Sequence, residues 1–521
     1  MAEEKIKLNR TENTVRNIIS GFINKLLTTL LPFVVRTVLI KTIGIEYLGL
    51  CSLFTSILTV LNLSELGFSS AVVYSMYKPI SEDDKETLCA LLKFYRKVYF
   101  WVGIVVIIGG LGILPFLKVF IKGAVPSDVN IYILFLIFLS NTAIGYLTFG
   151  YKQALFNAYQ RQDLISNVYS VTQLIMFICQ LVLLLVFKNY YWYIGITPVF
   201  TIINNVLLSI FVNKFYPEIK CKGSLSVEYK SEIRKNVSGL LISKVCGVTR
   251  NSLDSIFISS FLGLTMTAIY SNYYLIFSTI IGFLVIFLQS MLGGIGNSIQ
   301  TETKEKNYED MKKFNFIYMW IGGWCTICLL CLYQPFMKFW MGDGFLLPFG
   351  AVILICLYFF LLKAGDMTSV YYDAVGIWWE NRWRYILETI GNIVLNFILG
   401  KYFGIYGIII ATIITILFIG YLMGNQILFK KYFQNGQCLN YLIFIQGKNL
   451  IITTVIGVIT LFICNLIKLP DTKLFNGLTF LINGLICLIL PNVLYYLVFF
   501  KTKDFQIAKD WLLGFVKRSV R

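Results

Sequence analysis

The 521-residue chain contains no histidine. Histidine is the commonest general base and a frequent metal ligand, so its absence excludes most zinc sites and most Ser or Cys catalytic triads. A G-x-x-x-x-G-K-[ST] sequence is also missing, so the chain does not hydrolyse ATP through a P-loop. Charged residues make up only 14% of the chain. These absences favour a protein that is not an enzyme and whose surface does not mainly face water.

Apolar residues dominate instead, at 57% of the chain with a mean hydropathy of +0.73. No water-soluble fold could hide this much apolar surface. Apolar runs long enough to cross a hydrocarbon core of about 30 Å occur at 17–40, 48–77, 94–121, 129–157, 165–187, 191–213, 236–262, 267–297, 314–337, 349–375, 384–400, 405–429, 449–467 and 475–500. We therefore predict an all-α membrane protein with fourteen transmembrane helices.

The positions of lysine and arginine predict the orientation, because basic residues are retained on the cytoplasmic side. With the N-terminus inside, 31 of the 45 basic residues fall in cytoplasmic segments and only 8 lie outside. Both termini are therefore expected in the cytoplasm. This bias also accounts for the net charge of +18 without a nucleic-acid partner.

Residues 16–103 align without gaps onto residues 235–322 at a constant offset of 219. The matched positions include Lys25/Lys244, Gly44/Gly263 and Trp101/Trp320. Six spans separate the two starts, so the repeats enter the membrane in the same direction. Parallel repeats are typical of secondary transporters, whose substrate site lies between the two halves.

The repeat predicts a domain organisation of two six-helix lobes and a C-terminal extension. The predicted parts are an N-lobe over 1–214, a cytoplasmic linker over 215–235, a C-lobe over 236–430, two further helices over 449–500 and a tail over 501–521. In the tail, apolar residues recur at helical spacing opposite lysines, which predicts an amphipathic helix at the membrane surface.

Eleven charged residues lie inside the predicted spans, where a buried charge costs several kcal/mol on even the lenient scales. They are Lys25, Arg36, Lys152, Lys244, Arg250, Lys363, Glu65, Asp254, Asp366, Asp373 and Glu388. Such residues face water or one another, so we expect a solvated cavity. Lys363, Asp373 and Glu388 lie near span ends and are expected to extend to the interface instead.

The basic residues are the candidate substrate ligands. Lys25 and Arg36 are eleven residues apart, about three helical turns, so they share one face of the first span at two depths. With Lys152 against Glu65, the first half has a positive balance, which suits a phosphate or diphosphate anion. Lys244 and Arg250 of the second repeat complete the predicted substrate-binding set.

The acidic residues are the candidate sites for a coupling ion, Na⁺ or H⁺; no other cofactor is expected. Arg250 and Asp254 are spaced i,i+4 and can pair when no substrate is bound, or can form a purely structural ion pair. Glu65 in mid-span is a competing candidate, and Asp366 is a third. The C-x-x-C-x-x-C spacing within 325–331 lies in an apolar span and is interpreted as packing residues.

Two groups of segments resemble bacterial oligosaccharide flippases of the multidrug/oligosaccharidyl-lipid/polysaccharide exporter superfamily. The segments Arg36–Leu50 and Leu63–Ala71 resemble that family's first two spans, and Asp254–Gly263, Tyr270–Tyr273 and Gly296–Asn297 resemble its second half. The resemblance implies a V-shaped, MATE-like pair of lobes plus two helices. It also implies alternating access for a polyprenyl-diphosphate (undecaprenyl-type) oligosaccharide, and polysaccharide assembly enzymes as partners.

Two alternatives remain open at this stage. A multidrug or small-molecule exporter on the same fold would be expected to offer acidic groups to cationic drugs. A membrane-embedded polysaccharide polymerase or glycosyltransferase should carry a large outer loop or an acidic metal motif, whereas the longest outer loops here have about ten residues.

Overall fold

The computed structural model describes residues 10–62, 68–467, 470 and 472–519, and these residues form helices and connecting loops with no strand among them. The chain divides into two compact units, Met1–Ala268 and Ile269–Arg521. The predicted lobe boundary at 215–235 is drawn from the sequence repeat, whereas the boundary between the two units follows from the packing of the helices. The two boundaries need not coincide, so the lobe boundaries remain predictions.

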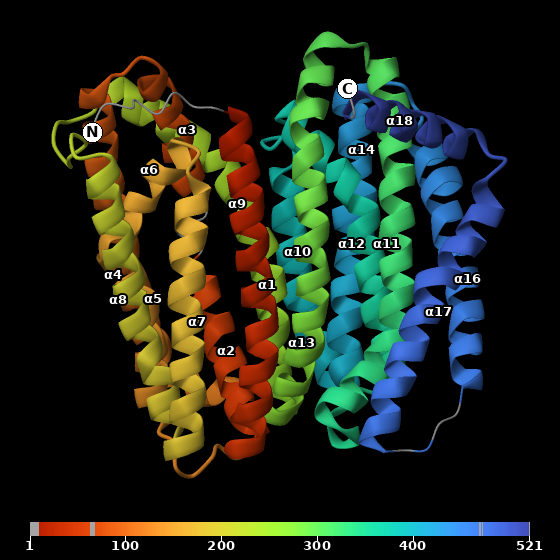
Figure 1. Cartoon of the computed structure of the whole chain (residues 1–521), viewed down its shortest axis with the longest axis horizontal. Coiled ribbons are helices and arrows are strands. Elements are labelled where there is room, and N and C mark those ends of the chain that lie inside the picture. The colour runs from red at the N-terminus through yellow and green to blue at the C-terminus, as the bar shows by residue number, and fades with distance from the viewer. Residues whose placement is uncertain (1–9, 63–67, 468–469, 471, 520–521) are drawn as a thin grey trace. The chain divides into compact units, whose positions relative to one another are not determined.

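The first unit is a bundle of long helices joined by short turns. In this unit α7 packs against both α1 and α8, and α5 packs against both α4 and α8 (Figure 1). Its helices are α1 (Arg10–Thr42), α2 (Ile45–Leu61), α3 (Phe68–Ser81), α4 (Lys85–Ile113), α5 (Ile131–Leu147), α6 (Gln153–Ala158), α7 (Gln162–Phe187), α8 (Tyr190–Phe215) and α9 (Val227–Leu262), with 3-10 turns η2 (Leu114–Phe120) and η3 (Phe149–Lys152). Buried residues of α3, α4, α6 and α8 share one apolar core, which includes Met76, Leu91, Phe156 and Leu208.

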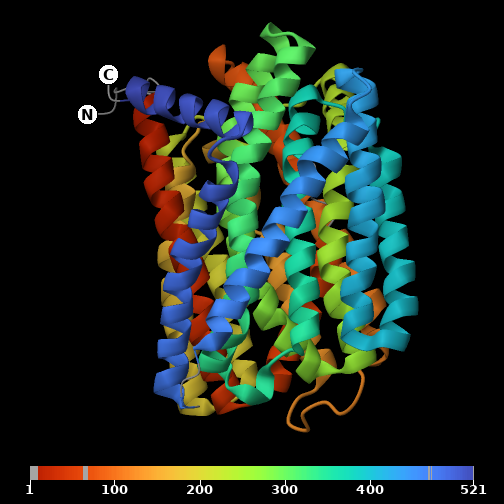
Figure 2. The same ribbon diagram turned by 90° about the vertical axis from the view of Figure 1, so that its right-hand side faces the viewer.

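The second unit begins within α10 (Leu264–Thr301). In it α17 and α16 pack against α11, and α18 lies across the end of these helices (Figures 1 and 2). Its helical elements are α11 (Lys304–Met341), η4 (Asp343–Phe345), α12 (Phe349–Val375), α13 (Arg382–Ile414), η5 (Thr415–Met423), α14 (Gly424–Leu428), η6 (Phe429–Phe433), α15 (Cys438–Asn440), η7 (Tyr441–Gly447), α16 (Lys448–Leu466), α17 (Lys473–Phe499) and α18 (Lys503–Ser519).

The predicted amphipathic tail is the helix α18. Its apolar side packs on α11, since the ring centroid of Trp511 lies 5.4 Å from that of Phe314 and Phe505 lies 6.1 Å from Trp320. Ala508 is buried between them, while Ile507 and Leu513 are exposed. The tail therefore helps to hold α11 as well as presenting apolar side chains outward.

Ten helices within the described residues are long and apolar enough to cross a membrane, or eleven if the bent pair of Ile131–Leu147 and Phe149–Ala158 is one span. The chain is thus a multi-pass membrane protein, but the expected count of fourteen is not confirmed. The predicted spans at 384–400 and 405–429 form one assigned stretch, Arg382–Phe433, although Gly404 breaks its helical geometry with φ 57°. Neither α2 nor α9 is among the ten helices. The helix α2 has only 17 residues. In α9, side chains are described for only part of the helix, and that part carries Arg250 and Asp254.

The backbone at two aligned glycines supports the internal repeat. Gly44 joins α1 to α2 with φ 123° and ψ 165°, and Gly263 joins α9 to α10 with φ 88° and ψ 178°. This region is essentially restricted to glycine. Thr265 Oγ1 donates a hydrogen bond to Glu46 Oε1 at 3.4 Å, and these two residues are also 219 positions apart. The two turns therefore meet at equivalent positions, as a local two-fold relation between them requires.

The meeting of these turns depends on Gly49, which is buried against the first residue of α10. A Cβ added at Gly49 would lie 2.2 Å from the carbonyl oxygen of Leu264, a backbone atom that cannot rotate away. We expect Gly49→Ala to lower the free energy of unfolding by about 1–3 kcal/mol or more through overpacking. Gly195→Ala is the matched control, because nothing lies within 4 Å of its added Cβ. The control should be neutral or up to about 1 kcal/mol more stable. Equal thermal unfolding midpoints for Gly49→Ala and the parent would contradict the close contact.

Candidate functional site

The helix α1 carries the first two predicted substrate ligands. It runs through Pro32 as one helix, so Lys25 and Arg36 keep the spacing that places them on one face about three turns apart. Both side chains are half-buried. The Arg36 guanidinium interacts electrostatically with the Cys51 thiol and the Tyr193 phenol. A guanidinium stays protonated in proteins, so it brings positive charge to this part of the first unit.

A cavity of about 260 Å³ lies between α2, α5 and α8. One of its lining residues is Cys51, which interacts with Arg36. It is lined by Cys51, Thr55, Leu58, Thr59, Asn62, Ile137, Phe138, Asn141, Thr142, Ile194 and Thr197. Within the described residues, Asn62 Oδ1 is buried and has no hydrogen-bond partner. Hydroxyl and amide groups on apolar walls can hydrogen-bond a neutral polar ligand, and sequence reasoning missed them because it considered only charges.

Lys152 lies at the bend between α5 and α6, where the helix axes change direction by 44°. Its Nζ donates to Ser209 Oγ and to Asn213 Oδ1 on α8, each at 2.8 Å. Both acceptors are neutral, so they orient the ammonium group without cancelling its charge. The bend positions a cation with a polar cradle, as an anion site would need.

The remaining candidates of the first unit lie on α9 or outside the described residues. Arg250 is half-buried and Asp254 is 2% exposed, one turn further along an uninterrupted helix. The side chain of Lys244 is not among those described, and Glu65 lies outside the described residues. The roles predicted for these four residues remain predictions.

Asp366, the candidate in the second unit, is held by two donors. Lys363 Nζ lies 2.5 Å from Asp366 Oδ2, and the Tyr318 hydroxyl donates to the same oxygen. The Lys363 side chain is 2% exposed and that of Asp366 22%. The expectation that Lys363 extends to the interface is therefore wrong, because its partner lies one turn away on the same helix. Together the Lys363 and Asp366 side chains carry almost no net charge, unlike the basic groups of the first unit.

The other two acids near span ends also have partners. Asp373 Oδ1 accepts a hydrogen bond at 2.8 Å from Trp378 Nε1, an arrangement that suits an interface. Glu388 is buried and lies 3.6 Å from Arg384 NH1. Arg384 is the first residue of the predicted span 384–400, and sequence reasoning did not pair it with Glu388.

A further charged group links α1 to α7. Arg161 donates two hydrogen bonds to Asp163, at 2.9 and 3.1 Å, and Arg16 approaches the same carboxylate at 3.2 Å. The hydrogen bond to Asp163 raises the pKa of Arg161. Asn17 Oδ1 accepts from the backbone N–H of Asp163 at 2.8 Å. The contacts of Arg16 and Asn17 fix the N-terminal part of α1 next to α7, and sequence reasoning missed them because they join residues 147 and 146 positions apart.

Comparison with solved structures places this fold among known transporters. The lipid II flippase MurJ in its inward closed conformation matches with a TM-score of 0.67 at 17% identity, covering 93% of this chain and 99% of that one. An inward-facing multidrug resistance MATE family transporter of the MOP superfamily matches with a TM-score of 0.58 at 15% identity, covering 79% and 97%. A MATE protein in the bent conformation matches with a TM-score of 0.52 at 18% identity, covering 80% and 95%. No curated protein sequence matches this chain.

The expected MATE-like fold is thus confirmed, and these similar structures belong to transporters. A family profile described as polysaccharide biosynthesis protein matches residues 14–292, more than half of the sequence. The matched region contains the basic residues of the first unit. The chain therefore belongs to the polysaccharide biosynthesis protein family and has the MATE-like fold of the MOP-superfamily flippases and transporters.

Proposed function

We propose that this chain is a lipid-linked oligosaccharide flippase. It moves a glycan carried on polyprenyl diphosphate from the inner to the outer leaflet of a bacterial cytoplasmic membrane by alternating access, with both termini in the cytoplasm. The observation that carries the proposal is the basic character of the first unit. Lys152 is cradled by neutral oxygens, and Arg36 stands beside a polar cavity. The polysaccharide biosynthesis family supports the substrate class.

The chemistry of the diphosphate explains why both kinds of cation are present. Arginine presents a planar fork that binds phosphate oxygens in pairs, whereas lysine supplies a point charge. The hydroxyl and amide groups of the cavity can donate hydrogen bonds to sugar hydroxyls and accept hydrogen bonds from them. We propose that Lys25, Arg36, Lys152, Lys244 and Arg250 bind the diphosphate in turn during transfer.

Coupling to a Na⁺ or H⁺ gradient would use a buried carboxylate. A diphosphate that competes with Asp254 for Arg250 would release Asp254 to take up the ion, so that ion and substrate occupancy are linked. We expect Asp254→Asn to lose the dependence of transport on the gradient while keeping substrate binding, and Arg250→Ala to lose both. Both variants and the double Ala variant should be compared for gradient-driven transfer and thermal stability.

Two results would contradict this coupling model. Intact gradient dependence in Asp254→Asn would eliminate Asp254 and favour Glu65 or Asp366. Two destabilised single variants whose double variant is partly restored would instead assign the pair a structural role. Glu46→Gln is a suitable control, because Glu46 is a carboxylate in the first turn of α2 whose one described hydrogen bond comes from the hydroxyl of Thr265.

Export of cationic drugs is the second candidate, because MATE transporters are among the similar structures. A binding competition separates the two. Purified protein should bind a polyprenyl diphosphate more tightly than the corresponding uncharged polyprenol, and cationic dyes should not displace it. Dye binding that the diphosphate cannot displace would favour the exporter. An enzymatic role as a polymerase or glycosyltransferase predicts glycan elongation during the same incubation, which we do not expect.

A further inference from the structure

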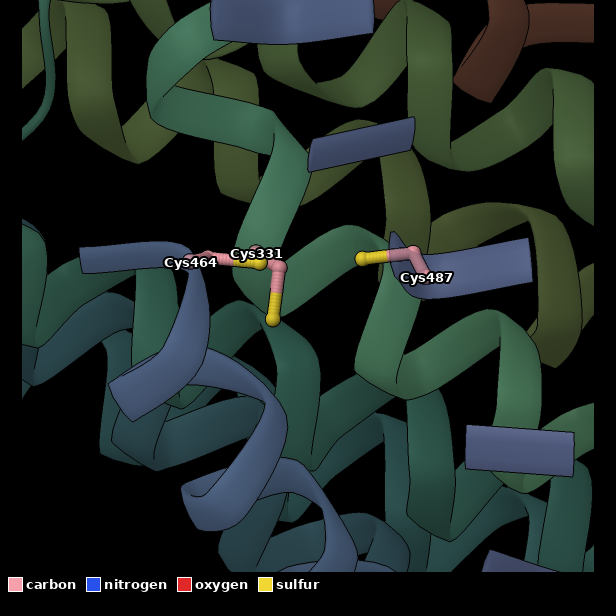
Figure 3. Close-up of side chains that lie close together, drawn as sticks. All are labelled: Cys331, Cys464 and Cys487. Atoms are coloured by element: carbon pink, nitrogen blue, oxygen red, sulfur yellow. The ribbon is translucent and has the colours of Figure 1, made fainter. Parts of the chain in front are cut away.

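Three buried cysteines from three different helices of the second unit converge on one point. Cys331 of α11, Cys464 of α16 and Cys487 of α17 have all three Sγ atoms within 4.8 Å of one another. Their side chains extend from the three helices into a shared space (Figure 3). None of the three forms a disulfide. The C-x-x-C-x-x-C spacing did not reveal this group, because two of its members lie more than 130 residues away.

The helices that carry these thiols are joined by hydrogen bonds, one of them at Cys487 itself. Trp324 Nε1 donates to the backbone carbonyl of Cys487 at 2.8 Å, which joins α11 to α17. The hydroxyls of Thr453 and Tyr495 lie 2.6 Å apart and join α16 to α17. Gly323 permits this approach, since an added Cβ would lie 2.3 Å from the Tyr495 hydroxyl oxygen. The sulfurs are therefore held in place before any ligand binds.

The surroundings of the cluster are apolar and dry. Cys331, Cys464 and Cys487 are 3%, 3% and 1% exposed and belong to one hydrophobic core, with Ile327 and Ile456. An ion in such an environment is stable only if its ligands are soft and the added charge is small. Oxygen-seeking ions such as Mg²⁺ and Ca²⁺ are excluded by the donor set.

The spacing of the sulfurs fits a three-coordinate soft ion. With metal–sulfur bonds of about 2.3 Å, three sulfurs around one ion lie about 4 Å apart. The observed limit of 4.8 Å is close to this value, and rotation about χ1 would close the difference. Zinc prefers four ligands, and Cys328 is the one further thiol in contact, through Cys487. Cys328 is only half-buried, unlike the other three.

We propose that Cys331, Cys464 and Cys487 form an intramembrane binding site for a soft, monovalent d¹⁰ metal ion, with Cu⁺ as the representative. Binding of one Cu⁺ releases one thiol proton to the solvent, so the site gains no net charge; the resulting thiolate is the main ligand and the other two sulfurs complete the coordination. The ion cross-links α11, α16 and α17, so it anchors the last two membrane helices to the second unit. The site is separate from the basic residues of the first unit and does not depend on the proposed transport function.

Metal titration of the reduced, full-length protein under anaerobic conditions tests the site. With Cu⁺ supplied from a competing chromogenic chelator, we expect one ion per chain, a rise in the thermal unfolding midpoint and an X-ray absorption spectrum with three sulfur neighbours. Each of Cys331→Ala, Cys464→Ala and Cys487→Ala should weaken binding by more than about 100-fold, since even loss of an outer-shell partner costs 10- to 100-fold. Cys356→Ala on α12 is the matched control: this cysteine is also buried and lies outside the cluster.

The outcomes are distinguishable even if one variant folds poorly, because alanine keeps the site apolar and the metal-free midpoint of each variant reports its folding. Unchanged Cu⁺ binding in the triple alanine variant would overturn the proposal. A failure of the parent to bind Cu⁺ with all three thiols reduced would do the same. A disulfide found by thiol counting before reduction, or a four-sulfur zinc site that Cys328→Ala abolishes and that excludes Cu⁺, would also overturn it.

Discussion

Arg36→Ala and Lys25→Ala should each reduce transfer of a polyprenyl-diphosphate oligosaccharide by about 10- to 150-fold. This range corresponds to the 1.5–3 kcal/mol that a hydrogen bond to a charged group contributes. Both residues lie on one face of α1, about three turns apart, so they can bind the diphosphate successively as it moves along the helix. Glutamate at either position should be no milder than alanine, because it adds repulsion to the loss of binding.

The measurement is leaflet transfer in proteoliposomes containing equal amounts of folded protein. Lys41→Ala is the matched control, because Lys41 is an exposed lysine in the last turn of the same helix. Its transfer rate should equal that of the parent. Arg36→Lys should recover only part of the activity, since lysine keeps the charge but loses the planar fork. Normal transfer by both alanine variants would eliminate α1 as the path of the diphosphate.

Lys363→Met should destabilise the protein strongly, by about 3–5 kcal/mol. The change leaves Asp366 without its ammonium partner, and the cost of breaking a buried ion pair from one side is of this size. The Tyr318 hydroxyl can still donate to the carboxylate, but it brings no compensating charge. The double variant Lys363→Met/Asp366→Leu should recover most of the stability, because it removes both charges and fills the space.

Thermal or denaturant unfolding of the single and double variants measures this coupling directly. The control is Lys78→Ala in the exposed pair Lys78–Glu82, whose side chains are 78% and 57% exposed and 4.0 Å apart. Exposed pairs contribute about 0–1 kcal/mol, so the control should unfold like the parent. If Lys363→Met were as stable as Lys78→Ala, the buried pair would not be the structural unit described above. A double variant that is stable and retains gradient coupling would remove Asp366 from the candidate ion sites.

Local sequence patterns predicted the features that depend on neighbouring residues. The register of the repeat aligned Gly44 with Gly263, and both residues have the backbone geometry that favours glycine. The helical spacing of the tail predicted α18. The pair Lys363–Asp366 could also have been found, because residues at i and i+3 share a helix face. Its burial was missed because span ends were judged from hydropathy alone.

Features that depend on contacts between distant segments could not be predicted in this way. The Arg16–Asp163 contact, the polar cavity and the convergence of Cys331 with Cys464 and Cys487 all require packing that a single sequence does not specify. The expected number of fourteen spans is not confirmed, for a different reason. A glycine such as Gly404 can end one helix and begin another without a change in hydropathy, so apolar runs and helices do not correspond one to one.

The central claim is tested most directly by leaflet transfer of a fluorescent polyprenyl-diphosphate oligosaccharide in liposomes that contain only this protein. A membrane-impermeant quencher added outside reports the fraction of substrate in the outer leaflet over time, with and without Na⁺ and H⁺ gradients. The account predicts transfer that is faster than in protein-free liposomes and in liposomes with Arg36→Ala, and no transfer of cationic dyes. A rate equal to that of protein-free liposomes under every gradient, together with gradient-driven dye transport, would contradict it.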